Sequence, residues 1–437
     1  MRQVSIVFRR MLYAAALCLL VLTLTGTRAD AASGTIRFNA NGGTGTMKSV
    51  DISGGKVTLP ANEFRRYGYI FRGWATSAEA VSADYDEKAV IKSPSSMTLY
   101  ALWEPQMYII HFDGSGETSG EMDDIYALYD QKTKLPQNQF YKKGYRLKGW
   151  KDESGNLILN LGTVRNLDSG NTYSRKIITV DAGKPENSKY TFRSTQGSVV
   201  FGENGKQYLV TAAGINDESY YDGDLSHYET VLTQYDLSTG KVVKRARNLA
   251  FDHGNGICYN PDNGHFYIAE GGSLEDYPGG VLEVDHNFKK VKEWNFPLLT
   301  NIWAIAYEDQ HFYVIGRNEG SRNSFCVLND EMKTLSITEA DQYYTQHFSS
   351  QGIAADANFI YAVSAGFQAY EWKTKQRINV FTHEGDYIGA WTLDIPNEAE
   401  DVTVIDGTAY ITTNEKQKAT LYETELPSVT LRAVWTK

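Results

Sequence analysis

Cysteine is scarce in this chain, with three residues among 437. Cys18 lies near the start, and Cys258 and Cys326 each lie in a strand-like apolar segment. So few cysteines exclude a fold held by a framework of disulfides. A single disulfide between Cys258 and Cys326 is one interpretation. Two buried thiols are favoured, because a chain of this length can bury a core without covalent cross-links.

Basic residues are also in short supply, with 43 Lys and Arg against 53 Asp and Glu and a formal net charge of -10. Residues 1–31 carry a net charge of +3, so the chain without them has a charge of -13. Nucleic acids and anionic lipid surfaces are bound through clustered Lys and Arg. We therefore expect no nucleic-acid partner and no anionic membrane surface as the partner.

Long apolar runs are missing after the first thirty residues. The run from Met11 to Leu24 has 14 residues, follows three arginines, and leads to the small residues Ala29-Asp30-Ala31. This pattern predicts a secretory signal peptide over residues 1–31 and is too short for a membrane span. Lipidation of Cys18 is the weaker alternative, because Leu17 is too bulky for a lipobox. We expect a secreted protein, extracellular or associated with the cell envelope, with no transmembrane segment.

Sequence motifs of common enzymes are missing as well. The chain has no Gly-x-Ser-x-Gly, no His-Glu-x-x-His, no Walker loop and no Cys/His pair at metal-binding spacing. These motifs place nucleophiles, metal ligands and phosphate-binding amides. We therefore assign no catalytic residues and expect that the protein is not an enzyme.

A repeat is present in the first part of the chain. Gly68 and Trp74 of "RRYGYIFRGW" recur 76 residues later as Gly144 and Trp150 of "YKKGYRLKGW". A fixed register over two copies indicates a tandem module. Alternating apolar residues and an Asn-Gly-Gly turn predict short strands, with the aromatic residues as core. A ligand-stacking role for Trp74 or Trp150 is the alternative.

The first copy resembles the Listeria/Bacteroides repeat, also called the internalin B-type repeat, of bacterial surface proteins. The segments that carry the resemblance are Phe38-Asn39-Ala40-Asn41-Gly42-Gly43, Leu59-Pro60, Gly68-Tyr69-Ile70-Phe71, Gly73-Trp74 and Leu99-Tyr100-Ala101-Leu102-Trp103. The resemblance implies a compact β-grasp-like module and a role in display or adhesion.

The second copy lacks its closing strand where the first copy has "MTLYALW". A matching segment, "VTLRAVW", occurs at the end of the chain, residues 429–435. We predict that residues 168–427 are inserted into the second repeat, since the termini of compact domains often lie close together. The predicted domains are then residues 34–105, residues 106–167 with 428–437, and residues 168–427. A truncated second repeat, with the last strand pairing elsewhere, is the alternative.

The predicted insert has its own period. Five segments share a small apolar strand, a turn and an aromatic strand, and their aligned residues are 59, 48, 48 and 49 positions apart. This spacing predicts a β-propeller of five blades, with six as the alternative, closed by a strand within residues 176–194. The whole protein is thus predicted to be mostly β. The aligned residues are Gly197, Gly256, Ala304, Gly352 and Asp401.

This region resembles bacterial five-bladed propellers of teichoic-acid-related and phage receptor-binding proteins, and more distantly NHL-type propellers. The segments that carry the resemblance are "HGNGICYNPDNGHFYIAEG", "SQGIAADANFIYAVSAG" and "INVFTHEGDYIGAW". Such a resemblance concerns the fold and does not identify a function.

The residue before each aligned position is expected to face the propeller axis. A ring of four polar side chains and one Trp would suit sugar hydroxyls, with the indole as a stacking face. Glu400 and Asp401 could instead hold Ca²⁺ through oxygen ligands, and a solvated channel lining is the remaining alternative. Residues 216–228 form an acidic loop without EF-hand spacing. The five predicted ring residues are Gln196, Asn255, Trp303, Gln351 and Glu400.

We therefore expect a secreted cell-surface binding or adhesion protein whose propeller binds a cell-wall polymer, a host glycan or a surface protein. One alternative is a propeller enzyme, either a metal-dependent lactonase-like hydrolase or a lyase that uses paired histidines such as His253 and His347. The other is a structural spacer without a ligand.

Overall fold

A computed structural model describes residues 34–437 with short gaps. The positions it does not describe are 1–33, 54, 93, 171, 182–190, 217–227, 248, 250, 252–253, 272–279, 297, 300, 318–322, 341–347, 367–375, 394 and 416–417. The described residues form strands and no helix. No described helix could therefore cross a membrane. The chain divides into two compact units, Met1–Pro105 and Gln106–Lys437.

The first unit holds the first repeat, a sheet with strand order β2-β1-β6-β4 and a separate β3-β5 pair. The Trp74 side chain is fully buried, with its ring 4.8 Å from Phe38 and 4.9 Å from Phe71. Its ring is therefore part of the core. The strands are β1(Gly34–Asn39), β2(Val50–Ile52), β3(Lys56–Thr58), β4(Tyr69–Ala75), β5(Val90–Lys92) and β6(Met97–Pro105).

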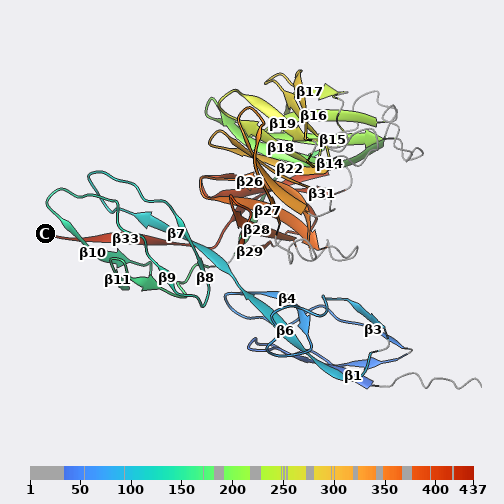
Figure 1. Ribbon diagram of the computed structural model, residues 1–437, viewed down its shortest axis with the longest axis vertical. Coiled ribbons are helices and arrows are strands. Elements are labelled where there is room, and N and C mark those ends of the chain that lie inside the picture. Colours follow the sequence, from blue (N-terminus) through green and yellow to red (C-terminus); the bar gives the residue numbers. More distant parts are fainter. Residues whose placement is uncertain are drawn as a thin grey trace, which may run out of the picture. The chain divides into compact units, whose positions relative to one another are not determined.

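The second repeat forms a sheet with strand order β11-β10-β33-β7-β8, in which the last strand of the chain is central. β33 pairs parallel with β7 and antiparallel with β10, as β6 pairs with β1 and β4 (Figure 1). Trp150 is fully buried in its core. The strands are β7(Met107–Asp113), β8(Ile125–Leu128), β9(Thr133–Lys134), β10(Arg146–Lys151), β11(Leu157–Leu159), β12(Thr163–Val164) and β33(Ser428–Thr436).

Between β12 and β33 the described residues form five four-stranded antiparallel sheets, the blades of a propeller. The strands of blades one to three are β14(Thr191–Glu203), β15(Lys206–Asn216), β16(Tyr228–Asp236), β17(Val242–Arg247); β18(Gly256–Asn260), β19(His265–Ala269), β20(Gly280–Val284), β21(Lys290–Asn295); and β22(Asn301–Glu308), β23(His311–Arg317), β24(Asn323–Asn329), β25(Thr334–Glu339). Those of blades four and five are β26(Phe348–Ala355), β27(Phe359–Gly366), β28(Gln376–Thr382), β29(Tyr387–Leu393); and β30(Ala399–Ile405), β31(Thr408–Glu415), β32(Lys418–Glu425), β13(Tyr173–Asp181).

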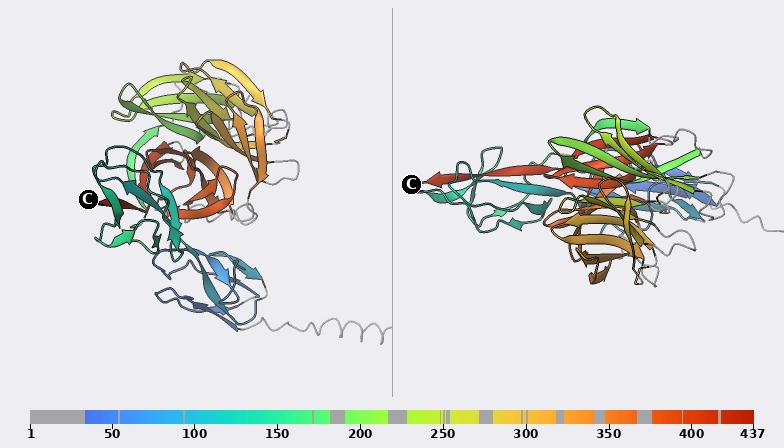
Figure 2. Two further views of the ribbon diagram at one scale, coloured as in Figure 1. Left: turned by 60° about the vertical axis from the view of Figure 1, so that its left-hand side comes forward. Right: turned by 90° about the horizontal axis from the view of Figure 1, so that it is seen from above.

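The innermost strands close into a ring, because each of β14, β18, β22, β26 and β30 contacts the next and β30 contacts β14 (Figure 2). The fifth blade takes its outer strand from the start of the region, where β13 pairs with β32. The expected closing strand within residues 176–194 thus begins three residues earlier, at Tyr173, and the count is five blades. Cys258 and Cys326 are buried free thiols in this propeller.

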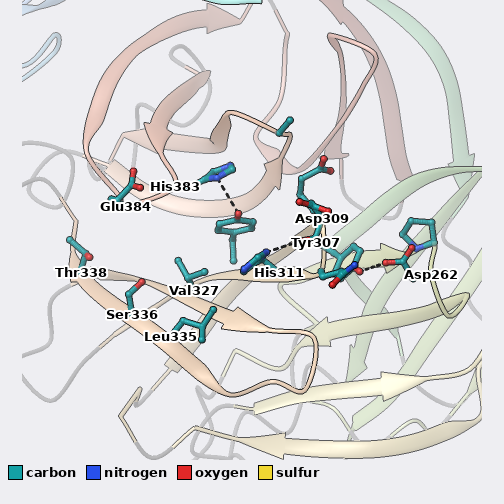
Figure 3. A pocket seen from close by; sticks show the side chains of 15 residues that line it. Asp262, Tyr307, Asp309, His311, Val327, Leu335, Ser336, Thr338, His383 and Glu384 are labelled. Atoms are coloured by element: carbon teal, nitrogen blue, oxygen red, sulfur yellow. Dashed lines mark hydrogen bonds between the residues drawn. The ribbon is translucent and has the colours of Figure 1, made fainter. Parts of the chain in front are cut away.

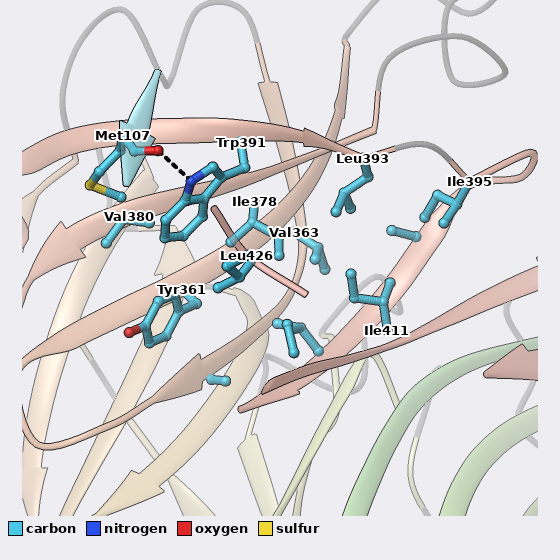
Figure 4. Packing of buried hydrophobic residues seen from close by; sticks show 14 of the residues in the cluster. Met107, Tyr361, Val363, Ile378, Val380, Trp391, Leu393, Ile395, Ile411 and Leu426 are labelled. Atoms are coloured by element: carbon cyan, nitrogen blue, oxygen red, sulfur yellow. Dashed lines mark hydrogen bonds between the residues drawn. The ribbon is translucent and has the colours of Figure 1, made fainter. Parts of the chain in front are cut away.

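The second repeat packs against the fourth blade within the same unit. The indole N–H of Trp391, a fully buried residue of β29, donates to the backbone O of Met107 at 2.7 Å (Figure 4). Gly389 leaves room for this approach, since a Cβ there would lie 3.2 Å from Leu128 and 3.5 Å from Met107. The apolar core is therefore continuous between the repeat and the blade.

Candidate ligand-binding site

The aligned small residues lie where the innermost strands come closest. A Cβ on Gly256 would lie 2.8 Å from the Cα of Ala304, and one on Gly197 would lie 3.1 Å from the Cα of Gly256. A Cβ on Gly352 would lie 1.9 Å from Oδ1 of Asp401. The period in the sequence therefore marks a layer of the axis in which four blades present small residues and the fifth presents a carboxylate.

Asp401 links the blades at this layer. Its Oδ2 accepts the backbone N–H groups of Ser198 at 2.8 Å and Ile257 at 3.3 Å, and its Oδ1 accepts that of Val402 at 2.9 Å. Burial raises the pKa of Asp401, while these three donors lower it. Ser198 and Ile257 belong to the first and second blades, so the carboxylate joins the last blade to both.

A cation site at Glu400 and Asp401 stays a prediction. Both oxygens of Asp401 already accept backbone hydrogen bonds, although a carboxylate oxygen has room for a further partner. Across the described residues, no group of three or more His, Cys, Asp or Glu is placed to hold a metal ion. The best-supported role of Asp401 is thus structural.

Each predicted ring residue lies just before this layer, and four of the five lie in a β-bulge. The pairing between the first two strands of a blade shifts register at Gln196, Trp303, Gln351 and Glu400. Asn255 precedes β18, and its N–H donates to the carbonyl of Ala269 at 3.0 Å. A bulge leaves one residue out of the ladder and re-aims its side chain. We call these five ring residues the axial mouth.

Two members of the axial mouth, Gln351 and Glu400, both interact with Glu398. Gln351 Nε2 donates to Oε1 of Glu398 at 2.8 Å, which links the fourth blade to the fifth. Glu400 is hydrogen-bonded to the side chain of Asn414 and lies close enough to Glu398 for their charges to interact. Burial first, and then repulsion from Glu398, raise the pKa of Glu400 well above its ordinary value. Burial also raises the pKa of Glu398.

The other ring residues have separate neighbours. Trp303 faces Arg317, whose guanidinium carbon is 5.2 Å from the ring centroid. The side chain of Asn255 lies against Gly271. A Cβ added to Gly271 would be 3.1 Å from the Oδ1 atom of Asn255. That oxygen is buried and has no hydrogen-bond partner among the described residues. Gln196 is partly exposed at the corresponding position of the first blade.

Glu398, Asn414 and Arg317 were not among the residues predicted from the sequence. Glu398 could have been found, because it precedes Glu400 by two positions and residues two apart lie on one face of a strand. Asn414 and Arg317 lie near the ends of second strands and have no recognisable motif. His253, His347 and most of the acidic loop, residues 217–227, lie outside the described residues.

Comparison with known proteins identifies the repeats. Residues 35–102 and 108–163 match the model of the Listeria-Bacteroides repeat domain, which is typical of surface proteins. Two proteins of Evansella cellulosilytica, named as a Gly-rich membrane protein and a membrane protein, are 33% identical over 119 residues and 30% identical over 141 residues. These alignments cover 25% and 32% of this chain but 14% and 20% of the relatives. The repeats therefore indicate a surface-associated protein.

Similar solved structures include a gluconolactonase from Xanthomonas campestris, the nidogen/laminin complex and the WD40 repeats of RRP9. Their TM-scores are 0.35, 0.32 and 0.32, with 12%, 12% and 10% sequence identity. The alignments cover 60%, 55% and 55% of this chain and 91%, 98% and 76% of those chains. Similarity at this level carries no functional inference, and the propeller is assigned from its own sheet topology.

Proposed function

We propose that this protein is a secreted, surface-associated binding protein whose axial mouth holds a glycan of the cell wall or of a host surface. The observation that supports it is the bulge that recurs at the mouth residue in four of five blades. Bulges are common beside binding sites, where they direct a side chain away from the sheet. A repeated bulge supports a shared purpose for these positions.

The chemistry of the axial mouth suits hydroxyl-rich ligands. Carboxamides both donate and accept hydrogen bonds, as sugar hydroxyls do, and Asn255 has a buried oxygen without a described partner. The ring of Trp303 offers an apolar face.

Two further proposals follow from the sequence. Secretion through the signal peptide, residues 1–31, would bring the propeller to the cell surface. The resemblance to propellers of teichoic-acid-related and phage receptor-binding proteins directs the ligand search to teichoic acid and peptidoglycan fragments. A surface protein is the alternative ligand, and we propose binding without turnover.

The test is thermal unfolding of residues 32–437 with teichoic acid, peptidoglycan fragments, calcium or EDTA. A ligand that binds the folded state at about 100 times its Kd stabilises it by about 2.7 kcal/mol. We expect a polymer to raise the unfolding temperature, and Trp303→Ala and Gln351→Ala to abolish the rise. Gln207→Ala, at an exposed position of β15, is the control.

Other results of the thermal-unfolding test would point to another site, another ligand or another function. A rise unchanged in both mouth variants would place the ligand elsewhere, and no rise with any polymer would favour the spacer. A calcium effect that EDTA reverses and Glu400→Gln removes would support the predicted cation site. Release of a product from a bound polymer would favour the propeller enzyme.

A further inference from the structure

A cavity lies near the other end of the innermost strands, away from the axial mouth. The axial mouth is found where these strands begin, whereas a groove of about 780 Å³ opens near the turns in which they end (Figure 3). It involves three consecutive blades. Asp262 comes from the β18–β19 turn, Tyr307 to His311 come from the β22–β23 hairpin, and His383 and Glu384 come from the β28–β29 turn. We call it the acidic groove.

The acidic groove carries uncompensated negative charge. Its lining includes four carboxylates, Asp262, Glu308, Asp309 and Glu384, and neither Lys nor Arg. None of the four forms an ion pair with a Lys or Arg that the structure describes. Burial, together with repulsion from Asp356 and Asp309, raises the pKa of Glu308. A bound cation would relieve this repulsion.

One wall of the acidic groove consists of fixed rings. Tyr313 and His383 lie 4.7 Å apart at 37°, and their hydroxyl and Nδ1 are 3.1 Å apart. His383 Nε2 lies 2.9 Å from the carbonyl O of Asp356, which can only accept, so Nε2 carries a proton. In the neutral ring the Tyr313 hydroxyl then donates to Nδ1. The hydroxyl of Tyr307 donates to Asp262. Fixed ring faces beside carboxylates are suited to an ammonium or guanidinium group.

The acidic groove continues into an apolar space, which we call the axial cavity. Pro261, Tyr307 and Glu308 line both this groove and the axial cavity of about 320 Å³. All five innermost strands contribute to that cavity, mostly through Val, Ile and Ala side chains. A ligand that fills both spaces must place an apolar group beside a cationic one. A metal ion would contact only the carboxylates, and the Tyr313 and His383 rings and the axial cavity would have no role in binding it.

We propose that the acidic groove binds a peptide segment of a protein partner in which an Arg or Lys follows or precedes an apolar residue. The cationic side chain lies between the Tyr313 and His383 rings and the carboxylates of Glu308 and Asp309. The apolar side chain enters the axial cavity. This site shares no residue with the axial mouth, so the two proposals fail separately.

The test is fluorescence anisotropy of residues 32–437 with a labelled hexapeptide that alternates Leu and Arg, beside Leu–Gln and Leu–Glu versions. We expect the Leu–Arg peptide alone to bind, with an affinity that falls as salt rises, because partly exposed charges are screened. The variant Glu308→Gln/Asp309→Asn should weaken binding at least about tenfold, as removal of close charge pairs at interfaces does. Asn suits the φ of 43° at position 309.

The control is Glu203→Gln/Asp406→Asn, which removes one carboxylate from the first blade and one from the fifth. Glu203 occupies the position equivalent to Glu308, and Asp406 the position equivalent to Asp309. Glu203 ends β14 as Glu308 ends β22, and Asp406 has a φ of 48°. This variant should bind the Leu–Arg peptide as the unmodified chain does. Equal weakening in both variants, equal binding of the Leu–Glu peptide, or no binding of the Leu–Arg peptide would overturn the proposal. So would full displacement by spermidine at equal concentration, since a polyamine lacks the apolar side chains.

Discussion

At the residue scale, the Oδ1 atom of Asp401 leaves no room for a side chain at position 352. Gly352 faces Asp401, and the carboxylate of Asp401 in turn holds the backbone N–H groups of Ser198 and Ile257. A side chain at position 352 and the carboxylate at position 401 compete for the same space. The small residues of the repeat are therefore required by packing around this carboxylate.

We predict that Gly352→Ala destabilises the propeller by about 1–3 kcal/mol, because overfilling a rigid core is costly. Its Cβ would lie 1.9 Å from Oδ1 of Asp401. Gly202→Ala is the matched control, since a Cβ there would meet no atom closer than 3.9 Å. Urea unfolding measures both variants. Equal midpoints for the two would contradict the axial packing described above.

The raised pKa of Glu400 predicts a pH dependence of stability. The folded state holds a proton on this carboxyl at pH values where the unfolded chain has lost it, so the free energy of unfolding falls as pH rises above the ordinary value of 4.5. The fall ends once pH exceeds the folded pKa. Glu400→Gln should flatten the dependence, measured as the urea midpoint between about pH 4.5 and 8. A slope equal to that of the unmodified chain would show that Glu400 is ionised when folded.

At the element scale, β7 and β29 couple the second repeat to the propeller. Trp391 of β29 is fully buried, and its indole N–H donates to the backbone O of Met107 in β7. On the repeat side, the hydroxyl of Tyr126 is hydrogen-bonded to that of Tyr361 in β27. Polar and apolar contacts thus hold the two modules against each other, and we expect them to unfold together.

We predict that Trp391→Phe lowers the free energy of unfolding by about 1–3 kcal/mol, because it leaves the buried carbonyl of Met107 without its donor. Trp294→Phe is the control. Its N–H donates to Glu283 at 3.2 Å, at a partly buried site on the outer strand of the second blade. Thermal unfolding should show a larger shift for Trp391→Phe. The reverse order would mean that the contact between repeat and propeller adds little to stability.

At the scale of the whole molecule, the chain makes the same sheet twice with different connections. In the first repeat β6 follows directly in sequence, whereas in the second the equivalent strand is β33, beyond all the propeller strands. Val429, Leu431 and Ala433 of β33 are buried in the core of that repeat. The domain boundaries at residues 168 and 427 stay predictions, although the strand pairing agrees with an insertion.

We predict that a chain shortened to Pro427 loses the fold of the second repeat and keeps that of the first. The truncation removes the central strand of one sheet and no strand of the other. Hydrogen exchange measured by mass spectrometry should show lost protection over residues 107–164 and unchanged protection over residues 34–105. Retained protection over 107–164 would show that β7 and β10 are stable without β33.

Much of the fold could be predicted because it follows from local patterns. The repeat register of Trp74 and Trp150, and the spacing of the aligned residues from Gly197 to Asp401, are periods of side-chain size and polarity. The mouth residues were predicted from the same period, as the position just before each aligned residue. Their function as a ligand site is still a proposal, and so is the absence of catalysis.

The sequence by itself determined that the protein is mostly β and that it contains two copies of a small module, and it predicted a propeller of five blades with six as the alternative. The sheet topology decided the count of five. These features depend on residues close together in the chain. Tertiary structure alone decided that Asp401 accepts hydrogen bonds from residues 203 and 144 positions away, and that four carboxylates from three blades line one groove. Such contacts depend on how the ring closes, and ring closure sets distances between side chains that no local period contains.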